Sequence, residues 1–205
     1  MNLFTDDLTT REYTRQFHIT GGDLLLYPGF FGQSEADKLL SDLSTFIEWT
    51  QERGTFFGKE QALPRLTAWY GDAGKSYSYS GIRVDPLPWI EPLSGIKTRI
   101  QAVSGARFNS VLLNLYRSGT DSVAWHSDDE PELGENPTIA SVSFGQERMF
   151  HLKHKHLKSE KLKLLLPHGS LLLMRGETQK NWLHQVPKSK REMQTRINLT
   201  FRYIR

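Results

Sequence analysis

The apolar positions of this chain follow two spacings, a helical one in the N-terminal half and a strand-like one in the C-terminal half. Residues 23–27 (DLLLY) predict a strand, and after a turn a helix is predicted with Ser34 as its N-cap and Asp37 three residues later. A second helix is predicted within residues 89–104. The apolar positions at three- and four-residue steps are Leu39, Leu40, Leu43, Phe46 and Ile47 in the first helix, and Leu93, Ile96, Ile100 and Val103 in the second. We expect both helices to cover one face of a sheet.

From residue 108 onward, short strands separated by turns replace the helical spacing. The predicted strands are 111–117, 138–144, 148–154, 161–166, 170–175 and 195–204. Strands that recur at intervals of about ten residues are typical of a β-sandwich or jelly roll. The expected fold is therefore mainly β with flanking helices.

Two of these strands are expected to have one polar and one apolar face. In residues 195–204 the polar face carries Arg196, Asn198, Thr200 and Arg202, and in residues 111–117 it carries Asn114 and Tyr116. A jelly roll with a polar inner face needs a polar ligand.

Composition narrows the class of protein. The chain has 205 residues, 38% of them hydrophobic, and is expected to fold as a single domain over 1–205, with 1–20 as an N-terminal extension. No apolar run approaches the roughly 20 residues of a membrane-spanning helix, and the N-terminus lacks a secretory signal, so no membrane association and a cytoplasmic location are expected. The chain has no cysteine, so any metal must be held by His, Asp or Glu. The net charge of +3 permits an anionic partner.

A candidate metal site begins with His126 and Asp128, which lie on the same side of an extended segment. His184 is the candidate third ligand, because a jelly roll can bring such distant strands together. Two histidines and one carboxylate leave coordination positions open, as non-haem Fe(II) oxygen chemistry requires. The alternative is that His126 and Asp128 belong to a solvated acidic turn.

A 2-oxoglutarate pocket needs side chains that bind carboxylates, and guanidinium groups do so in a bidentate manner. The candidates are Arg196 and Arg202, together with Asn114 and Tyr116. The alternative is that either arginine is exposed on an ordinary strand.

The chain resembles the AlkB family of Fe(II)- and 2-oxoglutarate-dependent nucleic-acid dealkylases over about residues 20–205. The blocks that carry the resemblance are PRLTAWYGDAGKSYSYSG (64–81), NLYRSGTDSVAWHSDDE (114–130), ASVSFG (140–145), HGSLLLMRG (168–176), WLHQVP (182–187) and RINLTFR (196–202). The resemblance implies a double-stranded β-helix (jelly roll) with a catalytic core at about 108–205 and an N-terminal nucleotide-recognition lid at about 50–85. It also implies that His126, Asp128 and His184 bind iron and that 2-oxoglutarate is held by Asn114, Tyr116, Arg196, Asn198 and Arg202.

The reaction implied by this resemblance is oxidative demethylation of bases such as 1-methyladenine and 3-methylcytosine. It uses Fe(II), O₂ and 2-oxoglutarate and releases formaldehyde, succinate and CO₂, which is direct reversal of alkylation damage. The expected partner is alkylated DNA, with RNA left open, and the enzyme is expected to be a monomer.

A base must be single-stranded or flipped out to reach a buried metal, so base-contacting residues are expected. By the same resemblance, Tyr79 stacks on the base and Tyr77 hydrogen-bonds near it, while Phe57 fills the gap that a flipped base leaves in a duplex. Arg65 is expected to contact a phosphate or the lid. For these tyrosines and for Phe57, packing in the core or lid is the alternative.

Charged segments complete the sequence-based picture. Asp129 and Glu130 are placed to favour cationic methylated bases, with a solvated acidic loop as the alternative. Residues 153–163 contain five lysines and two histidines, which predicts a hairpin that follows phosphates or, alternatively, a solvated hairpin. Two other functions stay open: a 2-oxoglutarate oxygenase of the same fold acting on a protein or small molecule, and a non-catalytic nucleic-acid binding module.

Overall fold

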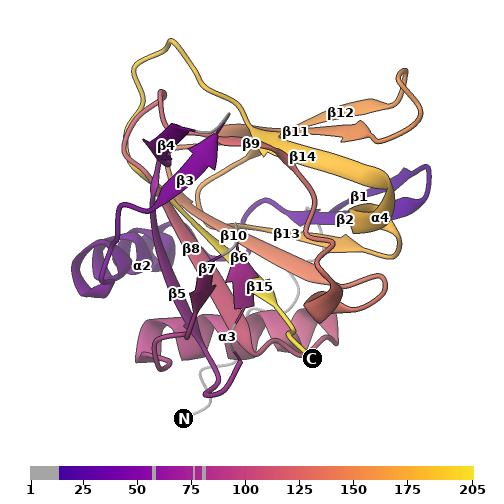
Figure 1. The fold of residues 1–205 in the computed structure, drawn as a ribbon. Coiled ribbons are helices and arrows are strands. Elements are labelled where there is room, and N and C mark those ends of the chain that lie inside the picture. The colour runs from indigo at the N-terminus through magenta and orange to yellow at the C-terminus, as the bar shows by residue number, and fades with distance from the viewer. Residues whose placement is uncertain (1–13, 57–58, 76, 80–81) are drawn as a thin grey trace.

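The computed structural model describes residues 14–56, 59–75, 77–79 and 82–205, and two antiparallel sheets that lie face to face dominate it (Figure 1). The larger sheet has seven strands in the order β1 (Arg15–Ile19), β2 (Gly22–Tyr27), β13 (Ser170–Arg175), β10 (Ile139–Gly145), β15 (Arg196–Arg202), β8 (Ser110–Tyr116) and β5 (Leu66–Gly71). The smaller sheet has four strands in the order β12 (Lys161–Leu166), β11 (Arg148–His154), β14 (Trp182–Val186) and β9 (Val123–His126). This architecture confirms the predicted jelly roll.

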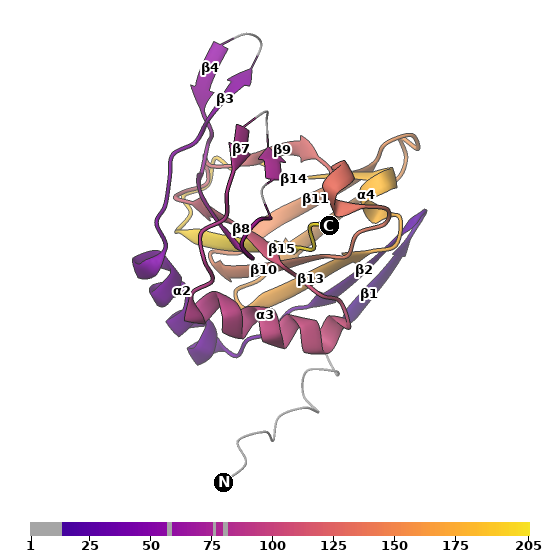
Figure 2. The ribbon, with the colours of Figure 1, turned by 60° about the horizontal axis from the view of Figure 1, so that its bottom comes forward.

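Two hairpins and four helical segments complete the described part of the chain. The hairpins are β3 (Arg53–Phe56) with β4 (Lys59–Ala62), and β6 (Tyr77–Tyr79) with β7 (Ile82–Val84). The helical segments are α2 (Gln33–Phe46), α3 (Glu91–Ser104), the short α4 (Thr178–Asn181) and the 3₁₀ turn η1 (Pro131–Leu133). Figure 2 shows the β3–β4 hairpin projecting well beyond the sheets.

Helices α2 and α3 cover the outer face of the larger sheet, as the helical spacing predicts (Figure 1). The core between helices and sheet includes Leu43 and Ile100 from the helices and Val142 and Leu199 from the sheet, all completely buried. One apolar position of the predicted helix does not face the core, because Phe46 at the end of α2 is 61% exposed.

The start of α2 corrects one detail of the sequence-based prediction. Gly32, not Ser34, is the N-cap, and no side chain caps the helix. The Asp37 carboxylate is engaged elsewhere: it accepts a hydrogen bond from Gln33 Nε2 at 3.1 Å and lies 3.2 Å from His168 Nε2. A carboxylate held in this way does not serve the capping box that the sequence pattern predicts.

The larger sheet extends beyond the predicted core of about 108–205. Residues of the expected extension form β1, which pairs with β2, and β2 pairs with β13. Within the expected lid, β5 pairs with β8, so among the described strands of that region those of the two hairpins lie outside the larger sheet.

A second apolar core fills part of the space between the sheets. Its buried side chains include Leu172 from the larger sheet and Leu152, Leu164 and Trp182 from the smaller one. Where this apolar packing ends, the polar face of β15 borders a cavity. No helix among the described residues is long and apolar enough to cross a membrane.

We predict that the last residue of β10 is sensitive to added side-chain volume. Gly145 has φ +84°, and a Cβ there would lie 2.4 Å from the carbonyl oxygen of Thr195, whereas Gly176 has φ +58° with open space around it. Gly145→Ala should combine a backbone penalty of roughly 1–2 kcal/mol with a backbone clash, and Gly176→Ala should show the backbone penalty alone. Urea unfolding of both variants measures the difference. Equal losses of stability would show that the close approach to Thr195 is unimportant.

Candidate metal centre

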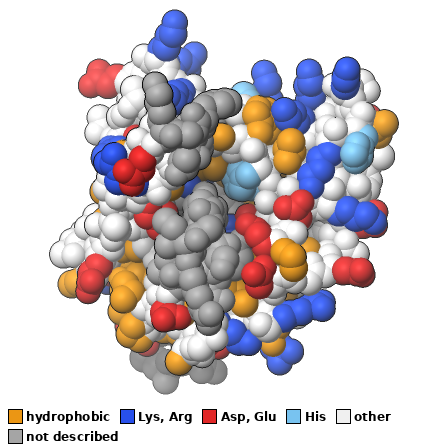
Figure 3. Space-filling model, viewed as in Figure 1, with side chains coloured by type: hydrophobic (Ala, Val, Ile, Leu, Met, Phe, Trp, Pro, Cys, Tyr) orange, Lys and Arg blue, Asp and Glu red, His pale blue; other side chains and the backbone are white. Residues whose placement is uncertain are grey.

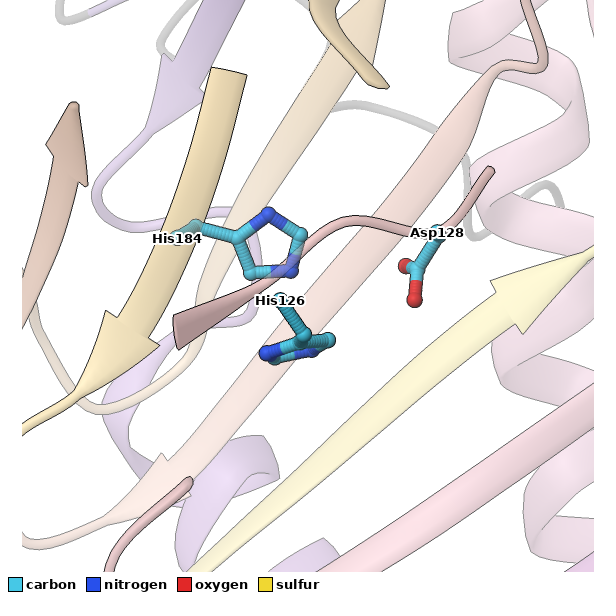
Figure 4. A group of neighbouring side chains, drawn as sticks. All are labelled: His126, Asp128 and His184. Atoms are coloured by element: carbon cyan, nitrogen blue, oxygen red, sulfur yellow. The ribbon is translucent and has the colours of Figure 1, made fainter. Parts of the chain in front are cut away.

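Two histidines face each other across the pairing of β9 with β14. His126 is the last residue of β9 and is the direct register partner of His184 on β14. Their imidazole centroids are 4.2 Å apart, and Figure 4 shows Asp128 on the chain that continues from His126. The ligand atoms that the three side chains offer lie within 4.8 Å of one another. Among the described residues, this is the group of His and carboxylate side chains that can hold a metal ion.

The Asp128 carboxylate is ionised, and one of its two oxygens accepts a hydrogen bond from the protein. Burial alone would raise its pKa, but the Arg202 guanidinium, with the imidazoles of His184 and His126, outweighs burial and lowers the pKa to about 2. Arg202 Nη2 donates to Oδ1 at 2.8 Å. The other oxygen, Oδ2, is buried without a hydrogen-bond partner. A buried carboxylate oxygen in this situation fits a metal ligand.

The surroundings of the two imidazoles suit metal binding in different ways. Burial is the main cause that lowers the pKa of His184 to about 3, so its imidazole is neutral at pH 7. His126 Nδ1 lies 2.8 Å from the carbonyl oxygen of Ala124, which can only accept, so Nδ1 carries the proton. This contact leaves Nε2 as the ring nitrogen of His126 that can bind a metal.

A cavity with a volume of about 110 Å³ opens beside these three side chains. Its wall contains all five residues expected to hold 2-oxoglutarate, namely Asn114, Tyr116, Arg196, Asn198 and Arg202. Both Arg196 and Arg202 are buried, so the alternative of exposed strand arginines is wrong.

Arg196 is a buried cation in the cavity wall that can bind an anion. It is 1% exposed, and burial lowers the pKa of its guanidinium. Nη2 donates to Ser143 Oγ at 2.9 Å, and the guanidinium carbon lies 5.0 Å from the centroid of the Tyr116 ring. Nε and Nη1 have no hydrogen-bond partner in the described part of the chain. A buried cation with two unused donors is a site for a carboxylate.

Arg65 lies inside the cavity wall. It is 4% exposed, and its Nε donates to Asn114 Oδ1 at 2.7 Å. The expected contact of Arg65 with a phosphate or the lid stays a prediction.

The two carboxylates after Asp128 have different surroundings. Glu130 lines the cavity, and its Oε2 is buried without a hydrogen-bond partner. Asp129 is exposed, and its Oδ2 pairs with Lys155 Nζ at 2.8 Å. Because burial opposes ionisation but Lys155 and Ser127 outweigh it, the pKa of Asp129 is lowered.

Three expected base-contacting residues are not placed by the structure. Phe57 lies outside the described residues, and for Tyr77 and Tyr79 only the backbone, in β6, is described. Their roles stay predictions.

Lysine side chains gather on the outer face of the smaller sheet, over β11 and β12 (Figure 3). Lys153 pairs in register with Lys161, and its Nζ lies 4.4 Å from the centroid of the Trp125 ring. Figure 3 also shows acidic side chains and a histidine near the centre of this view. In this view the lysines over β11 and β12 therefore lie apart from the acidic side chains at the centre.

One polar contact of the site was not expected from the sequence. Gln179, in α4, accepts a hydrogen bond from the backbone N–H of Asp128. Its position in a helix of four residues provides no periodic signal that a sequence pattern could detect.

Comparisons with known proteins are consistent with this geometry. The family model of the 2OG-Fe(II) oxygenase superfamily matches residues 23–202. Human "Alpha-ketoglutarate-dependent dioxygenase alkB homolog 3" is 45% identical over 188 residues, which are 87% of this chain and 65% of the human protein. The chain thus spans slightly less than two thirds of that relative. Mouse "DNA oxidative demethylase ALKBH2" is 40% identical over 188 residues, which are 87% of this chain and 79% of the mouse protein.

Solved structures support the fold. "The structure of OsALKBH1" matches with a TM-score of 0.66 at 16% identity and covers 92% of this chain and 100% of that one. An oxidoreductase of the 2OG-Fe(II) oxygenase family from Burkholderia pseudomallei matches with a TM-score of 0.58 at 11% identity, over 88% of this chain and 84% of that one.

The depressed pKa of His184 predicts how the stability of the metal-free protein depends on pH. The unfolded chain protonates this imidazole below its ordinary pKa of 6.5, whereas the folded chain does so only near 3. The contribution to stability is therefore complete above pH 6.5 and falls, by up to about 1.4 kcal/mol per pH unit, as the pH drops toward 3. Urea unfolding with a chelator present, from pH 7 to about 4, should show a steeper decline for the wild type than for His184→Asn. Parallel declines would contradict this prediction.

Proposed function

This chain belongs to the AlkB family within the 2OG-Fe(II) oxygenase superfamily, and we propose that it removes N-linked methyl groups from damaged bases in nucleic acid. The observation that carries the proposal is the meeting of three metal ligands and a buried arginine with unused donors in one cavity. The names of the curated relatives support the same activity.

The residues present fit an iron centre with 2-oxoglutarate. His126, Asp128 and His184 would supply three ligands of the kind that Fe(II) oxygenases use, and Oδ2 of Asp128 lacks any other partner among the described residues. When bound, Fe(II) with 2-oxoglutarate and O₂ supplies the oxidation that hydroxylates the methyl carbon, which leaves as formaldehyde while 2-oxoglutarate becomes succinate and CO₂.

The position of the co-substrate follows from β15. Arg196 and Arg202 lie on the same face of this strand, and Arg202 is bound to the metal ligand Asp128. Arg196, six residues earlier, is therefore the group that would hold the carboxylate farther from the metal. Asn114 and Tyr116, on the neighbouring β8, line the same cavity.

Glu130 supports a cationic substrate. Bases methylated at N1 of adenine or N3 of cytosine are cationic at neutral pH, and a carboxylate with one oxygen buried and without a hydrogen-bond partner attracts such a charge. Of the two adjacent acidic residues, Glu130 is the one that faces the cavity, whereas Asp129 is held by Lys155.

A nucleic-acid substrate is supported by the basic surface over β11 and β12 and by the position of the two hairpins. The lid role of these hairpins, base stacking by Tyr79, a hydrogen bond from Tyr77 and gap filling by Phe57 belong to this proposal. DNA is the proposed substrate because a relative is named as a DNA oxidative demethylase.

The test is mass spectrometry of oligonucleotides that carry one 1-methyladenine or 3-methylcytosine, incubated with the protein, Fe(II), ascorbate and 2-oxoglutarate. A loss of mass equal to one methylene unit, dependent on 2-oxoglutarate, is the expected result. Consumption of 2-oxoglutarate without any change in the oligonucleotides would favour a different substrate for the same iron site.

We expect Asp128→Ala and His126→Ala to abolish turnover while the affinity for the oligonucleotide stays within a few-fold of wild type. The reason is that phosphate contacts on a basic surface, not the metal ligands, dominate nucleic-acid affinity. Fluorescence anisotropy measures the affinity on the same oligonucleotides. If affinity and rate decline together, the metal ligands also carry substrate binding.

We expect Glu130→Gln to lower kcat/KM for the cationic 1-methyladenine substrate by about tenfold, because a charge attraction in a shielded cavity is worth on the order of 1–2 kcal/mol. Glu132→Gln is the matched control, since Glu132 is exposed in η1 and does not line the cavity. Similar effects of the two substitutions would assign the acidic loop a general, long-range role.

A further inference from the structure

Asp128 is held differently from the other two metal ligands. His126 and His184 are positioned by the backbone pairing of β9 with β14. Asp128 follows the end of β9 and lies in the loop that leads to η1, outside any strand. Its side chain reaches Arg202, but that bond fixes only the carboxylate end.

The backbone of Asp128 is fixed by Gln179. The Asp128 N–H donates to Gln179 Oε1 at 2.9 Å, and the Gln179 side chain is almost completely buried, at 1% exposed for the residue. Gln179 Nε2 lies 3.5 Å from Met174 Sδ, which can only accept. The two contacts agree on the orientation of the amide, with the oxygen toward Asp128.

Gln179 is itself anchored on both sides. The preceding residue, Thr178, accepts a hydrogen bond from the backbone N–H of Asp23 at 3.0 Å, which ties α4 to β2 in the larger sheet. The carbonyl oxygen of Gln179 accepts from Lys155 Nζ at 3.0 Å, and the same ammonium pairs with Asp129. Gln179 thus connects the ligand loop to a sheet that does not carry the loop.

We propose that Gln179 is a positioning residue for the metal ligand Asp128. Without an acceptor at this place, the Asp128 N–H is left buried and unpaired, and the loop relieves that cost by turning toward water. That rotation moves the Asp128 carboxylate away from the two imidazoles, with which it forms the metal-binding group. The inference rests on the metal site of the proposed function and is independent of the substrate.

The test compares Gln179→Met with Gln101→Met in anaerobic titrations with Co(II), a spectroscopic substitute for Fe(II) that the same N and O ligands bind. Gln101 is a matched control, because its Oε1 accepts a backbone N–H, that of Phe108, at the same distance of 2.9 Å, but on α3 and outside the cavity. Urea unfolding of the metal-free proteins reports the structural cost of each substitution.

We expect Gln179→Met to weaken Co(II) binding by about tenfold or more and to change the visible spectrum at saturating Co(II), because supporting partners of metal ligands typically have this effect. Gln101→Met should leave affinity and spectrum unchanged. A wild-type spectrum and affinity in Gln179→Met would overturn the proposal, as would equal changes in both variants.

Gln179→Glu keeps an acceptor oxygen at the same reach and serves if the methionine variant fails to fold. A wild-type Co(II) spectrum in this variant supports the proposal, and an altered spectrum contradicts it. Because Co(II) binding needs no oligonucleotide, failure of the demethylation assay leaves this test unaffected, and the two proposals can fail separately.

Discussion

The buried ion pair between Arg202 and Asp128 is the constraint on which the site depends, because it joins the two sheets at the metal centre. Arg202 ends β15 in the larger sheet, and Asp128 follows β9 of the smaller one. A buried pair of this kind is not in itself a strong stabiliser, since both ions lose their hydration. Its effect is specific: it helps to keep the carboxylate ionised, and it engages Oδ1 while Oδ2 is left without a hydrogen-bond partner among the described residues.

The ion pair also separates the functions of two arginines that share one strand face. Arg202 is committed in part to Asp128, so its charge is balanced within the protein. Arg196 has no acidic partner in the contacts of the described residues, and its nearest interactions are with Ser143 and the Tyr116 ring. One β-strand therefore presents a neutralised guanidinium beside the metal ligands and an unneutralised one at its other end. This asymmetry gives a ligand with a distal carboxylate a direction along the strand.

Long periodic segments were predictable from the sequence, and short ones were not. Helices α2 and α3 and the strands β8, β10, β11, β12, β13 and β15 were predicted to within a few residues. Strands β9 (VAWH) and β14 (WLHQV), which carry two of the metal ligands, were not among the predicted strands, because four or five residues with polar positions provide little periodicity. The extended segment expected to hold both His126 and Asp128 ends at His126, and Asp128 lies in the loop that follows. The sequence nevertheless identified His126, Asp128 and His184, since the residue types and the family resemblance required no strand boundaries.

The rest of the site depends on loop conformation, which residue types alone do not determine. Asp129 and Glu130 are adjacent and chemically similar, yet one is exposed beside Lys155 and the other lines the cavity. Which of them faces inward depends on backbone angles after β9 that no alternation rule describes, because the segment is not a strand. The same holds for Gln179, whose partner is 51 residues away in the chain.

The burial of Arg196 links the stability of the folded chain to the binding of a carboxylate. A guanidinium that is 1% exposed and lacks a counter-ion loses several kcal/mol of hydration, and the contacts with Ser143 and the Tyr116 ring compensate for only part of that loss because Nε and Nη1 have no partner among the described residues. A carboxylate that binds Nε and Nη1 removes that cost in the folded state only. By linkage, an anion that binds the folded chain stabilises it in proportion to the logarithm of its concentration. Buried ions are in general no more stabilising than apolar residues of the same volume. The unpartnered Nε and Nη1 that make the burial of Arg196 costly are also the donors that a carboxylate would satisfy.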